Sequence, residues 1–138
     1  MIMGFLYSKY IITCKNVIKH SDETLTFERS FEKLIVPKVP SEVDFNLVVG
    51  FEHSLTKDED LNIYFEMTDP FDETMMEAKL LTLEAVEDDK LTSVVNITKV
   101  KHVPVKKSGL YSMYIKHNGK IICKQDVLIR KGKEEKNE

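Results

Sequence analysis

Residues 108–129 read SGLYSMYIKHNGKIICKQDVLI, and this stretch contains the clearest fold signal in the chain. Two runs of strand-forming residues, 110–116 and 121–129, lie on either side of a short polar turn. The turn contains Asn118-Gly119, a pair preferred in type I′ turns because both central residues need a positive φ. The stretch therefore predicts a β-hairpin that closes at Asn118 and Gly119.

Alternation of apolar and polar residues repeats this strand signal upstream. Residues 45–51 and 61–67 place a large apolar residue at every second position, which is typical of a strand with one buried face. Residues 72–85 also contain helix-forming residues, but we favour a strand with a bulge near Leu81, where the apolar residues change parity. Further strands are expected in residues 6–14, 25–36, 76–83 and 92–103, the stretch 25–36 being one strand that continues through Phe31 to Val36.

The chain has 138 residues, of which 42% are hydrophobic and 31% charged, an ordinary composition for one globular domain. About eight short strands at regular spacing predict an all-β fold, and we favour a two-sheet antiparallel β-sandwich, immunoglobulin-like or similar, over a barrel. The domain is expected to cover residues 1–130. Residues 131–138 contain no apolar side chain and are predicted to form a charged, disordered tail.

Gly109 and Tyr111 open the penultimate predicted strand as Ser-Gly-x-Tyr. In immunoglobulin-type sandwiches a tyrosine at such a position forms the tyrosine corner, in which the phenol hydroxyl bonds to the backbone of an earlier loop. We therefore interpret Tyr111 as a structural residue rather than a catalytic one.

Several motifs taken together resemble a family of small bacterial all-β proteins of unknown function. The resemblance spans nearly the whole chain, and it differs at Lys15, where the family pattern often has an acidic residue. It implies a β-sandwich and supplies no activity, cofactor or catalytic residue. The motifs are residues 10–17 (YIITCKNV), the strand at 24–31, Ile35-Val36-Pro37 with Pro40, the strand at 45–49, Asp69-Pro70 and Gly109-x-Tyr111.

The usual catalytic and cofactor motifs are absent from the sequence. There is no Walker A loop, GxSxG elbow or GxGxxG turn, and neither the four histidines nor the two cysteines have metal-ligand spacing. Acidic residues at 58–60 and 69–73 flank one predicted strand and are interpreted as solvated turns rather than a calcium site. We expect no enzyme activity, no metal and no cofactor.

The first residues do not form a secretory signal, because Ser8-Lys9-Tyr10 interrupts the apolar stretch. No run of residues is long and apolar enough to span a membrane as a helix. We therefore expect a cytoplasmic protein whose Cys14 and Cys123 remain thiols.

Charge divides unevenly along the chain. Residues 1–98 contain 9 basic and 19 acidic residues, whereas residues 99–133 contain 10 basic residues and only Asp126 as an acid. If the last three strands are neighbours, they form one basic face that could attract a charged partner. The lysines predicted to form this face are Lys99, Lys101, Lys106, Lys107, Lys116, Lys120 and Lys124.

The charge split leads to a hypothesis of protein–protein interaction, with an unidentified protein or with a second copy of the chain. The alternative function is a small-ligand or carbohydrate-binding module, which an exposed cluster of Tyr7, Tyr10, Tyr64 or Tyr114 would support. A dispersed acid–base pair in an enzyme is a third hypothesis. The lysines could also simply protect exposed strands from aggregation or pair with acidic strands. Nucleic-acid binding is disfavoured, because Arg130 is the only arginine in the basic part.

Overall fold

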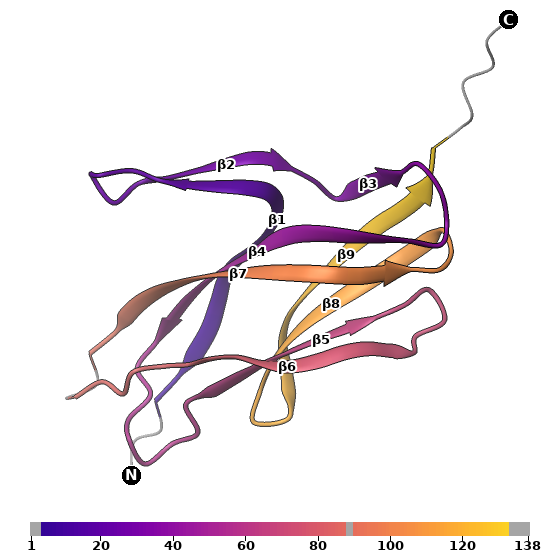
Figure 1. The fold of residues 1–138 in the computed structure, drawn as a ribbon. Helices are drawn as coiled ribbons and strands as arrows, with labels where there is room; N and C mark the ends of the chain where they lie inside the picture. Colours follow the sequence, from indigo (N-terminus) through magenta and orange to yellow (C-terminus); the bar gives the residue numbers. More distant parts are fainter. Residues whose placement is uncertain (1–3, 88–89, 133–138) are drawn as a thin grey trace, which may run out of the picture.

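A computed structural model describes residues 4–87 and 90–132, and this part of the chain consists of nine strands without a helix (Figure 1). It therefore has no helical segment that could cross a membrane. The strands are β1 (Leu6–Lys19), β2 (Leu25–Ser30), β3 (Lys33–Val36), β4 (Ser41–His53), β5 (Asn62–Thr68), β6 (Thr74–Thr82), β7 (Thr92–Val105), β8 (Gly109–His117) and β9 (Lys120–Lys131).

The strands form two sheets, in the orders β2-β1-β4-β7 and β3-β9-β8-β5-β6. All pairings are antiparallel except that of β3 with β9. The predicted all-β, two-sheet sandwich is confirmed. The predicted start of the tail is too early. Lys131 of β9 still pairs with Val36 of β3, and the Gly132 N–H donates to the Val36 carbonyl at 2.8 Å. The remainder of the predicted tail, residues 133–138, lies outside the described residues.

The chain changes sheet between β2 and β3, so the single strand expected over residues 25–36 is wrong. The Phe31 N–H donates to the Thr13 carbonyl of the four-stranded sheet at 2.9 Å. The next residue, Glu32, accepts from the Leu128 N–H of the five-stranded sheet at 2.9 Å. The apolar pattern continues through this point because both strands have a side that faces the core. Because the chain changes sheet here, the structure has nine strands instead of about eight.

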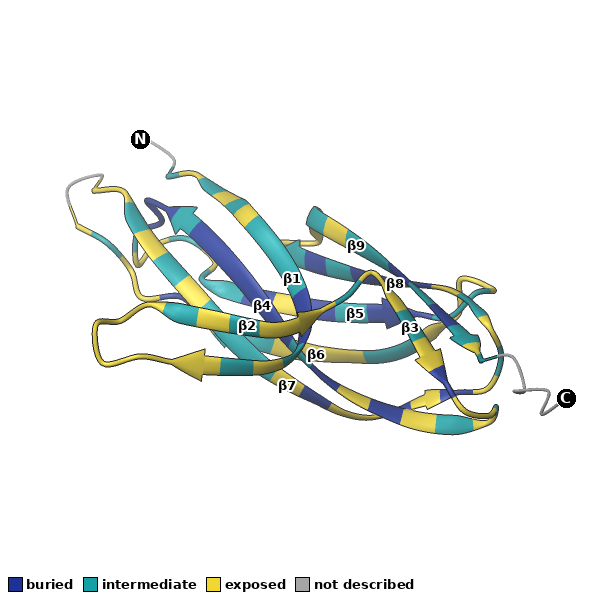
Figure 2. Cartoon of the chain, turned by 90° about the horizontal axis from the view of Figure 1, so that it is seen from above, coloured by how far each residue is buried: buried dark blue, intermediate teal, exposed yellow. Residues whose placement is uncertain are grey.

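The core lies between the inner faces of the sheets, and Figure 2 shows its buried residues concentrated in the central strands. Leu47, Val49 and Phe51 of β4 are fully buried, as are Ile63 of β5 and Ile115 of β8. The alternation that predicted β4 and β5 therefore reports their core-facing sides correctly. This packing holds β8 and β5 in the middle of one sheet and leaves β7 at the edge of the other.

Two local predictions are confirmed by the backbone. Asn118 and Gly119 have φ angles of 52° and 77°, as a type I′ turn requires, and the hairpin joins β8 to β9. Ile63 pairs with Leu81 and Tyr64 with Lys79, so β6 is a strand with an extra residue at the predicted bulge.

Candidate functional site

The predicted basic face does not form, because β7 is not a neighbour of β8 or β9. β7 pairs with β4 in the four-stranded sheet, whereas β8 and β9 belong to the five-stranded sheet. Lys99 and Lys101 therefore extend from one sheet, and Lys116 and Lys124 from the other. The remaining members of the set are Lys106 and Lys107 in the β7–β8 loop and Lys120 at the β8–β9 turn.

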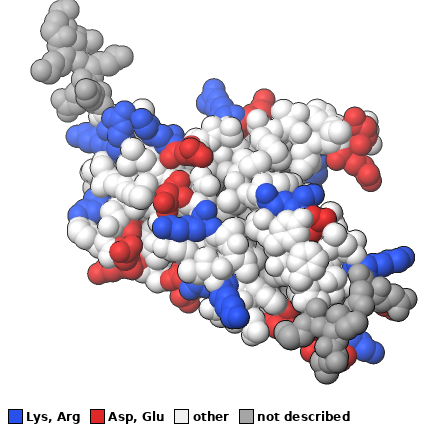
Figure 3. Space-filling model, turned by 180° about the vertical axis from the view of Figure 1, so that it is seen from behind, with Lys and Arg blue, Asp and Glu red and all other residues white. Residues whose placement is uncertain are grey.

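Acidic neighbours offset the charges of two of the predicted lysines, Lys116 and Lys124. Lys116 forms an ion pair with Glu66, and hydrogen bonds from Lys116 and Thr74 lower the pKa of the Glu66 carboxyl. Lys124 lies 3.5 Å from Asp126. Figure 3 shows the same mixture over one whole face of the molecule, where basic and acidic side chains are interspersed. These lysines form structural pairs rather than a free basic surface.

The tyrosines named for the carbohydrate alternative are split between the two sheets. Tyr7 and Tyr10 belong to β1, and Tyr64 and Tyr114 belong to β5 and β8. The Tyr10 ring packs over Gly50, where an added Cβ would lie only 2.3 Å from the ring. The four tyrosines therefore do not form one cluster, although Tyr64 and Tyr114 lie on neighbouring strands.

Tyr111 forms the hydrogen bond expected of a tyrosine corner. Its buried hydroxyl donates to the main-chain carbonyl of Lys107 at 2.7 Å, and burial raises the pKa of the phenol. Gly109, at the start of the same strand, has a φ of 156°, and a Cβ there would lie 2.6 Å from the Pro70 side chain. Tyr111 therefore closes the β7–β8 loop on itself, and Gly109 lets this loop lie close to the β5–β6 loop at Pro70.

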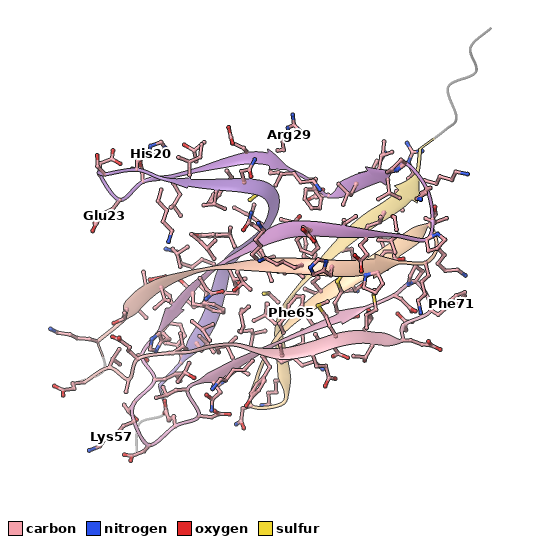
Figure 4. The ribbon with its side chains drawn as sticks, in the orientation of Figure 1. His20, Glu23, Arg29, Lys57, Phe65 and Phe71 are labelled. Atoms are coloured by element: carbon pink, nitrogen blue, oxygen red, sulfur yellow. The ribbon has the colours of Figure 1, made fainter. Side chains whose placement is uncertain are left out.

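A cavity of about 450 Å³ lies between these two loops. Asp69 accepts hydrogen bonds from the Phe71 and Glu73 N–H groups at 2.8 and 3.0 Å, and so shapes its own turn. The Lys107 ammonium lies 3.5 Å from the centre of the Phe71 ring, at the end of the molecule where Figure 4 labels Phe71. Most polar groups of the cavity are thus already engaged with the protein.

Three ionisable side chains in the interior favour their uncharged forms. His53 is fully buried, burial lowers its pKa, and its Nδ1 accepts from the Leu55 N–H at 3.1 Å. Burial also raises the pKa of the Cys14 and Cys123 thiols, which keeps them protonated rather than nucleophilic. Within residues 4–87 and 90–132, no three His, Cys, Asp or Glu side chains are grouped as metal ligands.

The four edge strands differ in how well they resist pairing with another chain. β2 carries Glu28 and Arg29, and Arg29 has a φ of 54° that disturbs the edge. β3 is only 4 residues long. β6 carries Glu77 and Lys79 together with its bulge. Short edges, charges and bulges are the usual protections against added strands, so these three edges are protected.

β7 lacks these protections over its first half. Residues 92–98 read TSVVNIT, without a charge or a proline, and we call them the uncharged edge. They belong to an unbroken register with β4 that runs from Thr92 opposite His53 to Val100 opposite Phe45. In the part of the chain that the structure describes, no loop and no side chain hydrogen-bonds to their backbone.

The sequence alone does not identify the uncharged edge as a binding site, although the lack of charge between Lys90 and Lys99 is visible in it. What the composition does not show is that β7 lies at an edge, since an apolar strand of this kind is equally typical of a sheet centre. A comparison with protein-family models finds no match, and a comparison with curated proteins finds none either. The resemblance to a bacterial family stays a prediction.

Proposed function

We propose that this protein is a non-enzymatic interaction module that binds an extended segment of a partner protein along the free edge of β7. The uncharged edge is the observation that carries this proposal. A partner strand placed there would form backbone hydrogen bonds that residues 92–98 do not form within the described chain. Adding a strand to an exposed sheet edge is a common mode of peptide recognition, in which main-chain bonds provide the affinity.

Side chains beside this edge support the proposal. Val95 has an exposed fraction of 48%, and Leu91, which immediately precedes β7, has 51%. Exposed apolar side chains next to unpaired backbone are unfavourable in isolation and favourable once a partner covers them. The small-ligand alternative has weaker support, because most polar groups of the loop cavity are engaged within the protein.

A photoreactive amino acid introduced at Val95 tests the proposal in native lysate. The matched control carries the same group at Tyr64 of β5, which has a similar exposed fraction of 44% and is paired on both sides, with Lys79 of β6 and Lys116 of β8. We expect a discrete cross-linked adduct from position 95 and none from position 64. Equal labelling at both positions, or no adduct at position 95, would reject the edge as the binding surface.

The proposal also places the protein in the cytoplasm. Cys14 and Cys123 are free thiols in different sheets, as is usual for proteins of a reducing compartment. Cell fractionation with an antibody to the protein checks this, and recovery outside the cytoplasmic fraction would contradict it.

A further inference from the structure

We infer that the partner strand at β7 belongs to a second copy of this chain, so that two copies pair through their uncharged edges into one continuous sheet. This inference rests on the proposed function and names its occupant. The pairing is antiparallel and symmetric, with a two-fold axis at Val95. Symmetric pairing of one surface with itself is the commonest way in which two identical chains associate.

The charge pattern of β7 permits this self-pairing. Antiparallel pairing about Val95 sets residue 92 opposite residue 98 of the second copy, so the uncharged edge matches itself over its whole length. Lys99 then lies opposite Leu91 of the second copy, and no lysine faces another lysine. Like charges placed directly opposite would destabilise such a pair. The small net charge of −3 for the whole chain adds only weak repulsion between copies.

The side chains on the outer face of the four-stranded sheet favour the same axis. Val48 of β4 is fully buried although it points away from the core, and its register partners Ile12 and Ile97 lie on either side of it. Val95 is the next outward-facing residue of β7 and is far more exposed than Val48. With the axis at Val95, the two Val95 side chains would contact each other and extend this small apolar cluster across the interface.

The other edge strands do not offer an equivalent match. The register of β6 with β5 is interrupted twice, between Ile63 and Tyr64 and between Met67 and Thr68, so the edge of β6 is not a regular ladder that a second copy could extend. β2 and β3 are 6 and 4 residues long, which leaves few backbone bonds to gain. Of the four edges, β7 is the one that combines a long regular register with an uncharged sequence.

Sedimentation of the purified full chain over a micromolar concentration range tests the inference. We compare the natural chain with Val95→Lys, which sets two ammonium groups together at the axis, and with the matched control Ile18→Lys. We expect the natural chain and the control to shift from monomer to dimer as concentration rises. Val95→Lys should weaken this association by more than about tenfold, since close like charges across an interface are strongly unfavourable. Thermal unfolding of each variant confirms that it is folded.

A cross-linking experiment tests the register independently of any loss of folding. In a Cys123→Ala background, Val95→Cys places two thiols opposite each other at the axis, within reach of a disulfide. Ser93→Cys is the matched control, because in this register residue 93 faces residue 97 of the second copy. We expect a disulfide-linked dimer from position 95 and none from position 93.

The outcomes separate this inference from the proposed function. A natural chain that remains monomeric at all concentrations, with no cross-link at position 95, overturns the second copy as partner. If photo-crosslinking at Val95 then yields a different protein, the proposed function stands without the self-pairing. A dimer that persists unchanged in Val95→Lys overturns β7 as the interface between copies.

Discussion

The hydroxyl of Tyr111 donates a 2.7 Å hydrogen bond to the main-chain carbonyl of Lys107, four residues earlier in the chain. This bond fixes the loop in which the chain passes from β7, at the edge of one sheet, to β8, in the middle of the other. The loop that joins the two sheets is therefore held by a contact that the Ser-Gly-x-Tyr motif predicts.

Replacing Tyr111 by Phe should lower the free energy of unfolding by about 1 kcal/mol, because a buried hydrogen bond is lost and the Lys107 carbonyl loses a donor. Chemical denaturation measures the change. Tyr114→Phe is the control, since no hydrogen bond to its hydroxyl occurs among the described residues. Equal losses in the two variants would mean that the Tyr111 hydroxyl does not stabilise the loop.

Gly119→Ala should destabilise the fold by roughly 1 kcal/mol, the usual cost of a left-handed conformation for a residue with a Cβ. No atom lies within 4 Å of the added Cβ, so the loss would come from the backbone conformation alone. Asn118→Gly should be close to neutral, because glycine adopts positive φ readily. A neutral Gly119→Ala variant in the same denaturation assay would contradict the type I′ turn.

Because His53 is buried in its neutral form, the stability of the fold should fall as the pH drops below about 6.5. Its pKa in the folded state is lowered by burial below 6.5, so the unfolded chain takes up a proton first as the pH falls. The stability that the fold has with neutral His53 is fully present above pH about 6.5 and is lost progressively as the pH falls below it. His53→Asn retains an acceptor for the Leu55 N–H and should reduce the slope between pH 7 and 5. An unchanged slope would show that another group titrates.

Lys116→Glu should act on stability and not on association. The new carboxylate would lie beside Glu66, which would lose its ion pair, and near Glu77. We expect a measurable loss of stability, because an attractive pair is replaced by two carboxylates side by side. Lys120→Glu, at the exposed hairpin turn, should have little effect. Weakened dimerisation in Lys116→Glu with unchanged stability would instead place the interface on the five-stranded sheet.

Much of the fold could be predicted from the sequence, because strand periodicity and turn chemistry are local. The 108–129 hairpin, the bulge near Leu81 and the Tyr111 hydrogen bond all follow from neighbouring residues. The crossover at Phe31 and Glu32 could not be predicted, since residues on both sides have the same apolar pattern. Neither sheet order nor strand neighbours are visible in one sequence.

The candidate site could be predicted less well than the fold, because it depends on which strands are neighbours. The lysines from Lys99 to Lys124 are close in sequence but lie in different sheets, because β7 pairs with β4. Lys116 and Lys124 also have acidic neighbours that come from other strands or from the same strand two residues away. The uncharged edge could be identified only once β7 was known to be an edge strand.

The most direct test of strand addition at β7 measures amide hydrogen exchange of residues 92–98 at increasing protein concentration. About half of these amides point away from β4 in an antiparallel ladder and lack a partner in the monomer. Their exchange should slow as concentration rises, while the amides of the exposed edge of β6 remain unchanged. Exchange at 92–98 that is equally fast at every concentration would contradict pairing of the uncharged edge with a second copy.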